Sequence, residues 1–112
     1  MSSILTIDIA HPPLTSAEAE AVLDEAFRTI QLSSSLRVLK VIHGYGSHGK
    51  GGTLKTFVRN WAFTHRSRIR EVIDGENLSP FNPTVQQLLS SLEIPSGDIG
   101  SPNDGITVLW LR

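Results

Sequence analysis

The stretch that decides the fold is VIHGYGSHGKGGTLKTF, residues 41–57, with five glycines and two histidines between an apolar run and a helix-like run. This stretch matches three short motifs at once. Its glycines match the dinucleotide fingerprint G-x-G-x-x-G, the same glycines followed by Lys50 match most of a P-loop, and His43 begins an H-G-x-G sequence. The glycines concerned are Gly44, Gly46 and Gly49. The elements around the stretch must decide among the three motifs.

The length and composition predict one globular domain spanning residues 1–112. A hydrophobic content of 39% and a charged content of 19% are ordinary for a soluble protein. No stretch approaches the roughly 20 apolar residues that cross a bilayer, and the first residues lack the basic-then-apolar pattern of a secretory signal. The absence of cysteine excludes disulfides and thiolate metal sites. We therefore expect a cytoplasmic protein.

Positive charge is concentrated between residues 37 and 70, which hold eight of the ten Lys and Arg residues and no Asp or Glu. Residues 71–111 hold six acids and no Lys or Arg. Such a segment predicts a basic face for phosphate or nucleic acid. The alternative is a helix and loop that are basic only because they are solvated.

Hydrophobic periodicity predicts a β-α-β-α-β-β order. A capping box at Thr15 and Glu18 opens the first helix, and Asn82 with Pro83 opens a short helix inside the long connection 74–105. The other expected elements are strands at 4–9, 36–42, 69–73 and 106–111 and a helix from about residue 53. This order predicts an α/β two-layer sandwich with a mixed four-stranded sheet.

Two of the three motifs conflict with their surroundings. Gly51 follows Lys50 where a P-loop needs Ser or Thr to hold Mg²⁺. Asp74 lies where a dinucleotide site needs its ribose acid, but the glycines follow the second strand and too few strands remain for such a fold. All three motifs share a glycine turn at a helix N-terminus, where free N–H groups and the helix dipole favour an anion. A tight turn without a ligand is the alternative.

His43 favours the third motif, because it ends a strand directly before the glycines and its side chain would face the same anion. Histidine is a usual proton donor or acceptor, although a structural role is equally open for His43 alone. At this point the chain resembles the Smr (small MutS-related) domain family. The segments that carry the resemblance are TIDIAHPPLTSAEAEAVLDEAF, LRVLKVIHGYGSHGKGGTLKTFVRNW and GITVLWLR, which together span most of the chain.

The resemblance implies a sandwich related to the C-terminal domain of a bacterial initiation factor, binding of DNA or RNA and, in many members, endonuclease activity. It implies a phosphate at the glycine turn, with acid or base chemistry from His43 and a tuning role for Asp8. The residues expected to bind phosphate are Gly44, Gly46, Gly49, Lys50, Lys55 and Arg59. His48 is expected to be a solvent-exposed loop residue and His65 a structural one.

The first strand departs from the family's L-D-x-H motif, because Ala10 occupies the histidine position and His11 follows it. A bulge would bring His11 into the site beside Asp8 as a second catalytic group. Strand alternation would instead point Ala10 inward and His11 away. The residues leave both arrangements open, and the inward His11 is the one we expect.

We expect a monomer that binds nucleic acid and no membrane, and we predict no cofactor and no metal site because the His and Asp residues show no regular ligand spacing. Dependence on a divalent metal stays open. The first alternative function is a binding module without catalysis, and the second is a small phosphate or nucleotide binder. The acidic connection 74–105 is expected to cover a sheet edge or to offer a partner site.

Overall fold

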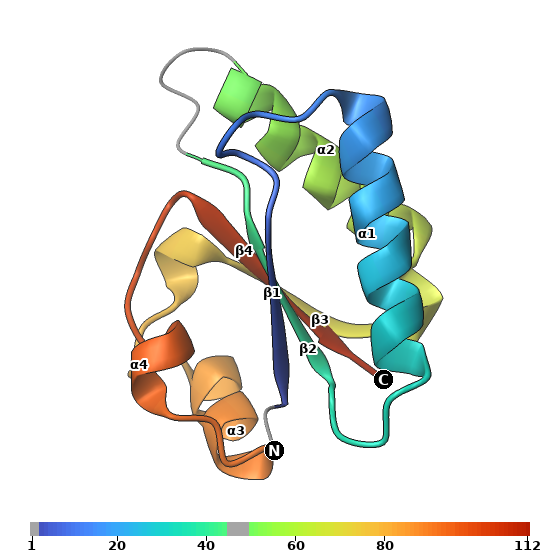
Figure 1. Ribbon diagram of the computed structural model, residues 1–112. Coiled ribbons are helices and arrows are strands. Elements are labelled where there is room, and N and C mark those ends of the chain that lie inside the picture. The colour runs from blue at the N-terminus through green and yellow to red at the C-terminus, as the bar shows by residue number, and fades with distance from the viewer. Residues whose placement is uncertain (1–2, 45–49) are drawn as a thin grey trace.

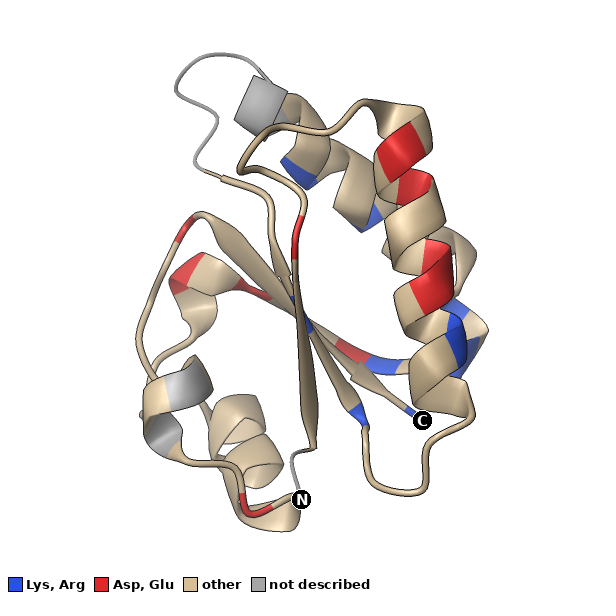
Figure 2. Cartoon of the chain, viewed as in Figure 1, with Lys and Arg blue, Asp and Glu red and all other residues tan. Residues whose placement is uncertain are grey.

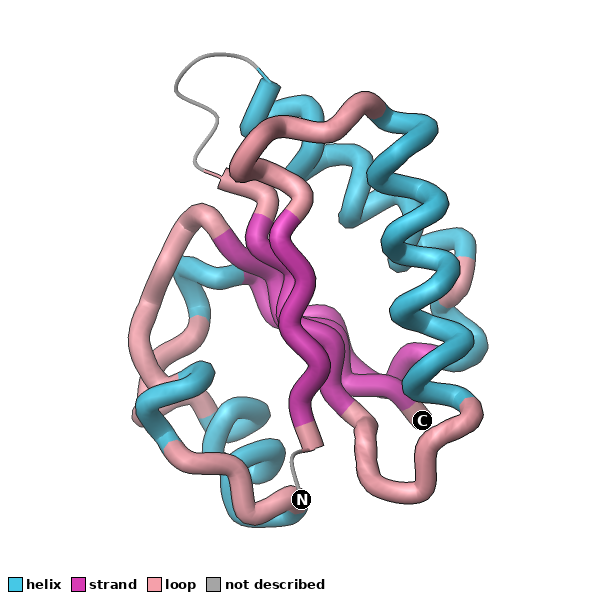
Figure 3. The backbone as a smooth tube through the Cα atoms, viewed as in Figure 1, coloured by secondary structure: helices cyan, strands magenta, loops and turns pink. Residues whose placement is uncertain are grey.

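The computed structural model describes residues 3–44 and 50–112, and a four-stranded mixed sheet runs through its centre (Figure 1). The strand order is β1-β2-β4-β3. β1 and β2 are parallel, whereas β4 is antiparallel to both of its neighbours. The strands are β1 (Ile4–Asp8), β2 (Val38–Ile42), β3 (Ile69–Asp74) and β4 (Ile106–Leu111). The predicted mixed sheet is confirmed, and Figure 3 shows helices on both of its faces.

The strand boundaries follow local hydrogen bonding. β2 begins at Val38, later than the expected residue 36, because the Ser33 hydroxyl accepts hydrogen bonds from the backbone N–H groups of Ser35 and Leu36. Such a bond closes a turn and keeps these residues out of the sheet. β4 has the predicted bounds, and all six of its residues are buried because it lies between β2 and β3.

One face of the sheet is covered by α1 (Ser16–Gln31) and α2 (Lys50–Thr64). The capping box of α1 is confirmed: Thr15 Oγ1 accepts from the Glu18 N–H at 3.2 Å, and Glu18 Oε1 accepts from the Thr15 N–H at 2.9 Å. α2 begins before the expected residue 53. The buried helix residues of this core are Ala19, Leu23, Ala26, Ile30, Leu54, Val58, Trp61 and Ala62. They pack on Leu39, Val41, Leu109 and Leu111 of the sheet.

The opposite face is covered by the connection after β3. It contains the 3-10 helix η2 (Gly75–Asn77), α3 (Pro83–Ser91) and α4 (Ser96–Ile99). The predicted cap of α3 is confirmed, since Asn82 accepts from the Thr84 N–H. A second core forms here from Leu78, Val85, Leu88, Ile94 and Ile99 against Val38, Ile73, Ile106, Val108 and Trp110. The connection was expected at a sheet edge or a partner site. It covers a face because Val38, Val108 and Trp110 need burial there.

Gly75 fixes the path of this connection. A Cβ atom at Gly75 would lie 1.7 Å from the Asn103 carbonyl oxygen, so only glycine fits. The Gly75 carbonyl accepts from the Asn103 N–H at 2.8 Å and thereby joins the start of the connection to its end. This contact holds Asp74 and Glu76 beside α2, where they affect the candidate site.

Candidate functional site

The candidate site lies at the end of the sheet where β1 and β2 end and β4 begins. We call this end of the strands the loop end. The chains after β1 and β2 stay together, because the Ile9 N–H donates to the Ile42 carbonyl at 2.9 Å. The N–H groups of His43 and Gly44 both donate to the Gly105 carbonyl, at 2.9 and 3.0 Å. Ligands of α/β sheets commonly bind outside the carboxyl ends of parallel strands. Figure 1 shows the β1–α1 connection and the start of α2 at this end.

Gly44 has an unusual backbone conformation. Its φ is +83°, in a region that residues with a Cβ rarely adopt. The Gly44 N–H, however, donates to the Gly105 carbonyl and is not free to bind an anion. Gly44 therefore turns the chain away from β2. Gly46, Gly49 and His48 lie outside the described residues.

Asp8 and His11 form an exposed pair at the end of β1. The His11 Nδ1 atom lies 2.9 Å from Oδ2 and 3.1 Å from Oδ1 of Asp8. The His11 side chain is 70% exposed and that of Asp8 is 39% exposed. The same carboxylate accepts from the Ala10 N–H at 2.8 Å and from the His11 N–H at 3.1 Å. A carboxylate can only accept hydrogen bonds, so Nδ1 of His11 carries a proton and donates to Asp8. The other ring nitrogen, Nε2, faces solvent.

The pKa of Asp8 reflects these contacts. Partial desolvation raises it, but the hydrogen bonds from the Ala10 backbone and from the His11 ring and backbone outweigh that effect. The pKa therefore lies below its ordinary value, and Asp8 stays ionised at neutral pH. An ionised Asp8 accepts the hydrogen bond from Nδ1 and orients the ring.

The turn after β1 combines features of both arrangements that the sequence left open. Ala10 is nearly buried and forms an isolated bridge with Pro13, as strand alternation suggested. His11 lies outside the core, but its ring turns back to Asp8. The expected contact between His11 and Asp8 is present. His11 and His43 do not share one open site, because His43 is buried.

His43 was expected to face an anion, and the structure instead places its side chain in the interior, at 0% exposure. Alternation along β2 explains this, because His43 follows Leu39 and Val41 onto the face covered by α1 and α2. Its Nδ1 lies 3.0 Å from the Gly44 carbonyl oxygen and its Nε2 lies 2.9 Å from Thr107 Oγ1. A carbonyl can only accept, so Nδ1 carries the proton and Nε2 accepts from the Thr107 hydroxyl.

Burial lowers the pKa of His43. The hydrogen bond to the Gly44 carbonyl opposes this shift, and the positive charges of Lys55 and Arg59 add to it. His43 is therefore neutral at neutral pH, and both of its ring nitrogens are occupied. This geometry suits a residue that fixes the start of the glycine segment.

The cations of α2 at the loop end are paired with acids of the connection. Lys55 Nζ lies 3.2 Å from Glu76 Oε2. Arg59 reaches Asp74 through two bonds, Nη2 to Oδ2 at 2.8 Å and Nε to Oδ1 at 3.2 Å. The hydrogen bond from Lys55 lowers the pKa of Glu76. Lys55 and Arg59 were expected to contact phosphate, and in this structure they contact carboxylates. Lys50 is the first residue of α2, and its side chain lies outside the described residues.

In Figure 2 the Lys and Arg residues are spread from α2 to the lower end of the sheet near the C-terminus. His65 has the expected structural role, since its ring stacks on Trp61 at 4.1 Å and its Nδ1 lies 2.8 Å from the Trp61 carbonyl oxygen.

Among residues 3–44 and 50–112, no group of three or more His, Asp or Glu could hold a metal ion. No helix in this part of the chain is both long and apolar enough to cross a bilayer.

Sequence reasoning missed three residues of this site. Thr107 was read only as part of the last strand, and Asp74 and Glu76 were not expected to meet α2. A polar residue inside the otherwise apolar strand 106–111 is a signal for Thr107. The acids gave no comparable signal, because their position depends on how the connection folds back at Gly75.

Comparison with solved structures identifies the fold. The crystal structure of the Smr domain of Thermus thermophilus MutS2 matches this chain with a TM-score of 0.56 and 22% identity, over 99% of this chain and 99% of that one. This chain therefore has the Smr fold.

The family follows from the sequence. The Smr domain profile matches residues 12–77, more than half of the chain, and the protein belongs to the Smr domain family. This family is associated with nucleic-acid binding and nuclease activity. The matched segment includes the glycine stretch and begins directly after His11, so it does not contain Asp8 or His11. Comparison with curated proteins gave no match.

Proposed function

We propose that this protein binds nucleic acid at the loop end and cleaves a phosphodiester bond there with His11 as the acid or base. The observation that carries this proposal is the Asp8–His11 pair, an exposed imidazole oriented by a carboxylate. It lies at the end of β1, next to the segment that begins with His43 and Gly44. Membership of the Smr family supports the substrate class.

The proposed chemistry uses the free nitrogen of His11. Nε2 takes a proton from the attacking water or hydroxyl group as a new P–O bond forms, and the ester P–O bond to the leaving oxygen breaks. The leaving oxygen takes up a proton, from protonated His11 or from solvent. Asp8 accepts a hydrogen bond from Nδ1–H and so directs Nε2 to the substrate. His43 acts here as a positioning residue, because Thr107 and Gly44 occupy its two nitrogens.

The proposed phosphate contacts are the glycine segment, the N-terminus of α2, Lys50, Lys55 and Arg59. A phosphate that reaches Lys55 must exchange with Glu76, and one that reaches Arg59 must exchange with Asp74. Binding at these residues should therefore be weak and strongly salt-dependent.

Gel-shift and nicking assays with single- and double-stranded DNA and RNA test the proposal. Replacing both Lys50 and Lys55 with Ala should weaken binding to every sequence and flatten the dependence of affinity on salt. Arg28→Ala, which removes one exposed charge in the last turn of α1, is the control for losing a positive charge elsewhere. An unchanged salt dependence in the double variant would exclude the loop end as the binding site.

A binding module without catalysis is the second candidate function. The buried His43 favours it, since only one histidine among the described residues of the loop end is open to a substrate. Absence of cleavage of all four substrates, together with salt-dependent binding that requires Lys50 and Lys55, would support this candidate.

A further inference from the structure

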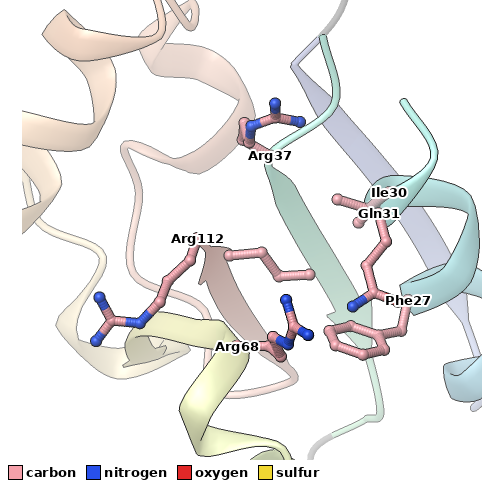
Figure 4. Close-up of a pocket in the computed structure, with 7 residues that line it drawn as sticks. Phe27, Ile30, Gln31, Arg37, Arg68 and Arg112 are labelled. Atoms are coloured by element: carbon pink, nitrogen blue, oxygen red, sulfur yellow. The ribbon is translucent and has the colours of Figure 1, made fainter. Parts of the chain in front are cut away.

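A pocket lies at the opposite end of the strands from the loop end, where β4 ends and β2 and β3 begin. We call it the arginine pocket. Its volume is about 150 Å³. It is lined by Phe27, Ile30, Gln31, Arg37, Arg68, Leu111 and Arg112, so three arginines from separate parts of the chain meet an apolar floor (Figure 4). In Figure 4 the Arg68 guanidinium and the Gln31 amide lie beside the Phe27 ring, whereas Arg112 extends away from it.

Backbone hydrogen bonds bring the three arginines together. The Leu111 N–H donates to the Arg37 carbonyl at 2.8 Å, and the Arg112 N–H donates to the Arg68 carbonyl at 3.0 Å. The guanidinium of Arg37 is further held by the Ser33 carbonyl oxygen, 3.0 Å from Nη1, and by the Leu36 carbonyl oxygen, 2.6 Å from the same atom. Because sheet pairing fixes the three segments, this arrangement persists without a ligand.

The charge of the pocket is not neutralised within the described part of the protein. No salt bridge joins Arg37, Arg68 or Arg112 to a described Asp or Glu, and no Asp or Glu lines the pocket. Lys55 and Arg59 each have a carboxylate partner. A partly enclosed pocket lined by arginines without a carboxylate partner attracts an anion.

We propose that the arginine pocket binds a phosphate group. Guanidinium groups match phosphate oxygens through two parallel N–H donors, and the Gln31 amide can supply another. A cavity of about 150 Å³ holds a molecule of the size of benzene, which exceeds a phosphate group and is less than a whole nucleotide. The phosphate comes either from a nucleic-acid strand or from a small free ligand. The pocket does not require that the loop end bind nucleic acid.

The test follows the side-chain Nε–Hε NMR signals of Arg37 and Arg68 in the full chain. Two probes are used at constant ionic strength: inorganic phosphate against chloride, and a short single-stranded oligonucleotide. We expect phosphate to shift both signals. Arg68→Ala should weaken phosphate binding about tenfold or more, because charge-assisted hydrogen bonds are lost. Arg66→Ala is the matched control, since it removes the same charge from the same 3-10 helix, η1 (Arg66–Arg68), but Arg66 lies over the Phe63 ring.

Arg37→Lys is the second variant, because Arg37 also supports the turn before β2. It keeps the charge, loses the two-donor geometry and should weaken binding less than Arg68→Ala. Shifts with the oligonucleotide as well as with phosphate would assign the site to a nucleic-acid strand, and shifts with phosphate alone would assign it to a small ligand. Unshifted Arg37 and Arg68 signals with both probes, or equal losses in Arg66→Ala and Arg68→Ala, would overturn the proposal. Neither result depends on Lys50 and Lys55.

Discussion

The loop end and the arginine pocket lie at opposite ends of the strands of one sheet, and they differ in whether their positive charges are paired with carboxylates. At the loop end, Lys55 and Arg59 are paired with Glu76 and Asp74. The three arginines that line the arginine pocket have no salt bridge to a described Asp or Glu. β4 connects the two places, since it begins at Ile106 beside the candidate site and ends at Leu111 in the pocket wall.

This difference shows that a segment rich in Lys and Arg does not by itself define a binding surface. Paired cations give up a carboxylate before they bind a phosphate, which reduces the net gain. Unpaired cations in a fixed pocket lose no partner on binding. The loop end nevertheless has what the pocket lacks, an imidazole held by a carboxylate, so the two places suit different tasks.

The largest expected effect separates chemistry from binding. If the loop end cleaves, His11→Ala should lower the cleavage rate by roughly 10²–10⁴-fold, because it removes a positioned acid or base. Affinity should change little. His65→Gln is the matched control, since His65 packs on Trp61. Single-turnover cleavage at saturating enzyme measures the rate; an equal rate in His11→Ala would remove catalysis from this end of the sheet.

Thr107→Val should produce the next largest effect. It leaves the buried Nε2 atom of His43 without a donor, which costs about 1–3 kcal/mol of unfolding free energy. Thr107→Ser keeps the hydroxyl and should cost less. Urea denaturation measures both variants. If valine and serine are equally tolerated, the hydrogen bond contributes nothing and the loop end is held by packing alone.

Removing the acids should make the loop end resemble the pocket. Asp74→Asn with Glu76→Gln frees Arg59 and Lys55, so nucleic-acid affinity at low salt should rise by up to about fivefold for each pair, the equivalent of ~1 kcal/mol per exposed ion pair. Gel shifts over a range of salt concentrations measure this. Glu93→Gln with Asp104→Asn, which removes the same negative charge elsewhere in the connection, should raise affinity less. A drop in affinity would mean that the acids hold the site in shape.

The smallest effect is a gradual dependence of stability on pH. Because the folded-state pKa of His43 is lowered, the unfolded chain binds the proton more readily. The free energy of unfolding should have its full value above the ordinary histidine pKa of about 6.5 and should fall as the pH drops below it. Thermal melts at several pH values measure this. His43→Gln should lose the part of the dependence near pH 6, while the part near pH 4, from Asp8 and Glu76, should remain.

The sequence by itself determined the elements and their order. The capping box at Thr15 and Glu18, the Asn82–Pro83 helix start and the apolar strand 106–111 are local signals, and the structure has all of them. It also located the turn at Gly44 and offered the contact between Asp8 and His11 as one of two arrangements. These features depend on residues that are close in the chain, where backbone preferences and side-chain hydrogen bonds act directly.

Only the tertiary structure decided which charges meet and which histidine is open. His43 is closed because Thr107, far along the chain, lies beside it on the covered face of the sheet. Lys55 and Arg59 meet Glu76 and Asp74 because the connection folds back at Gly75. Arg37, Arg68 and Arg112 meet because β4 pairs with both neighbouring strands. The pairing of distant segments sets these contacts, and the local pattern of residues does not encode it.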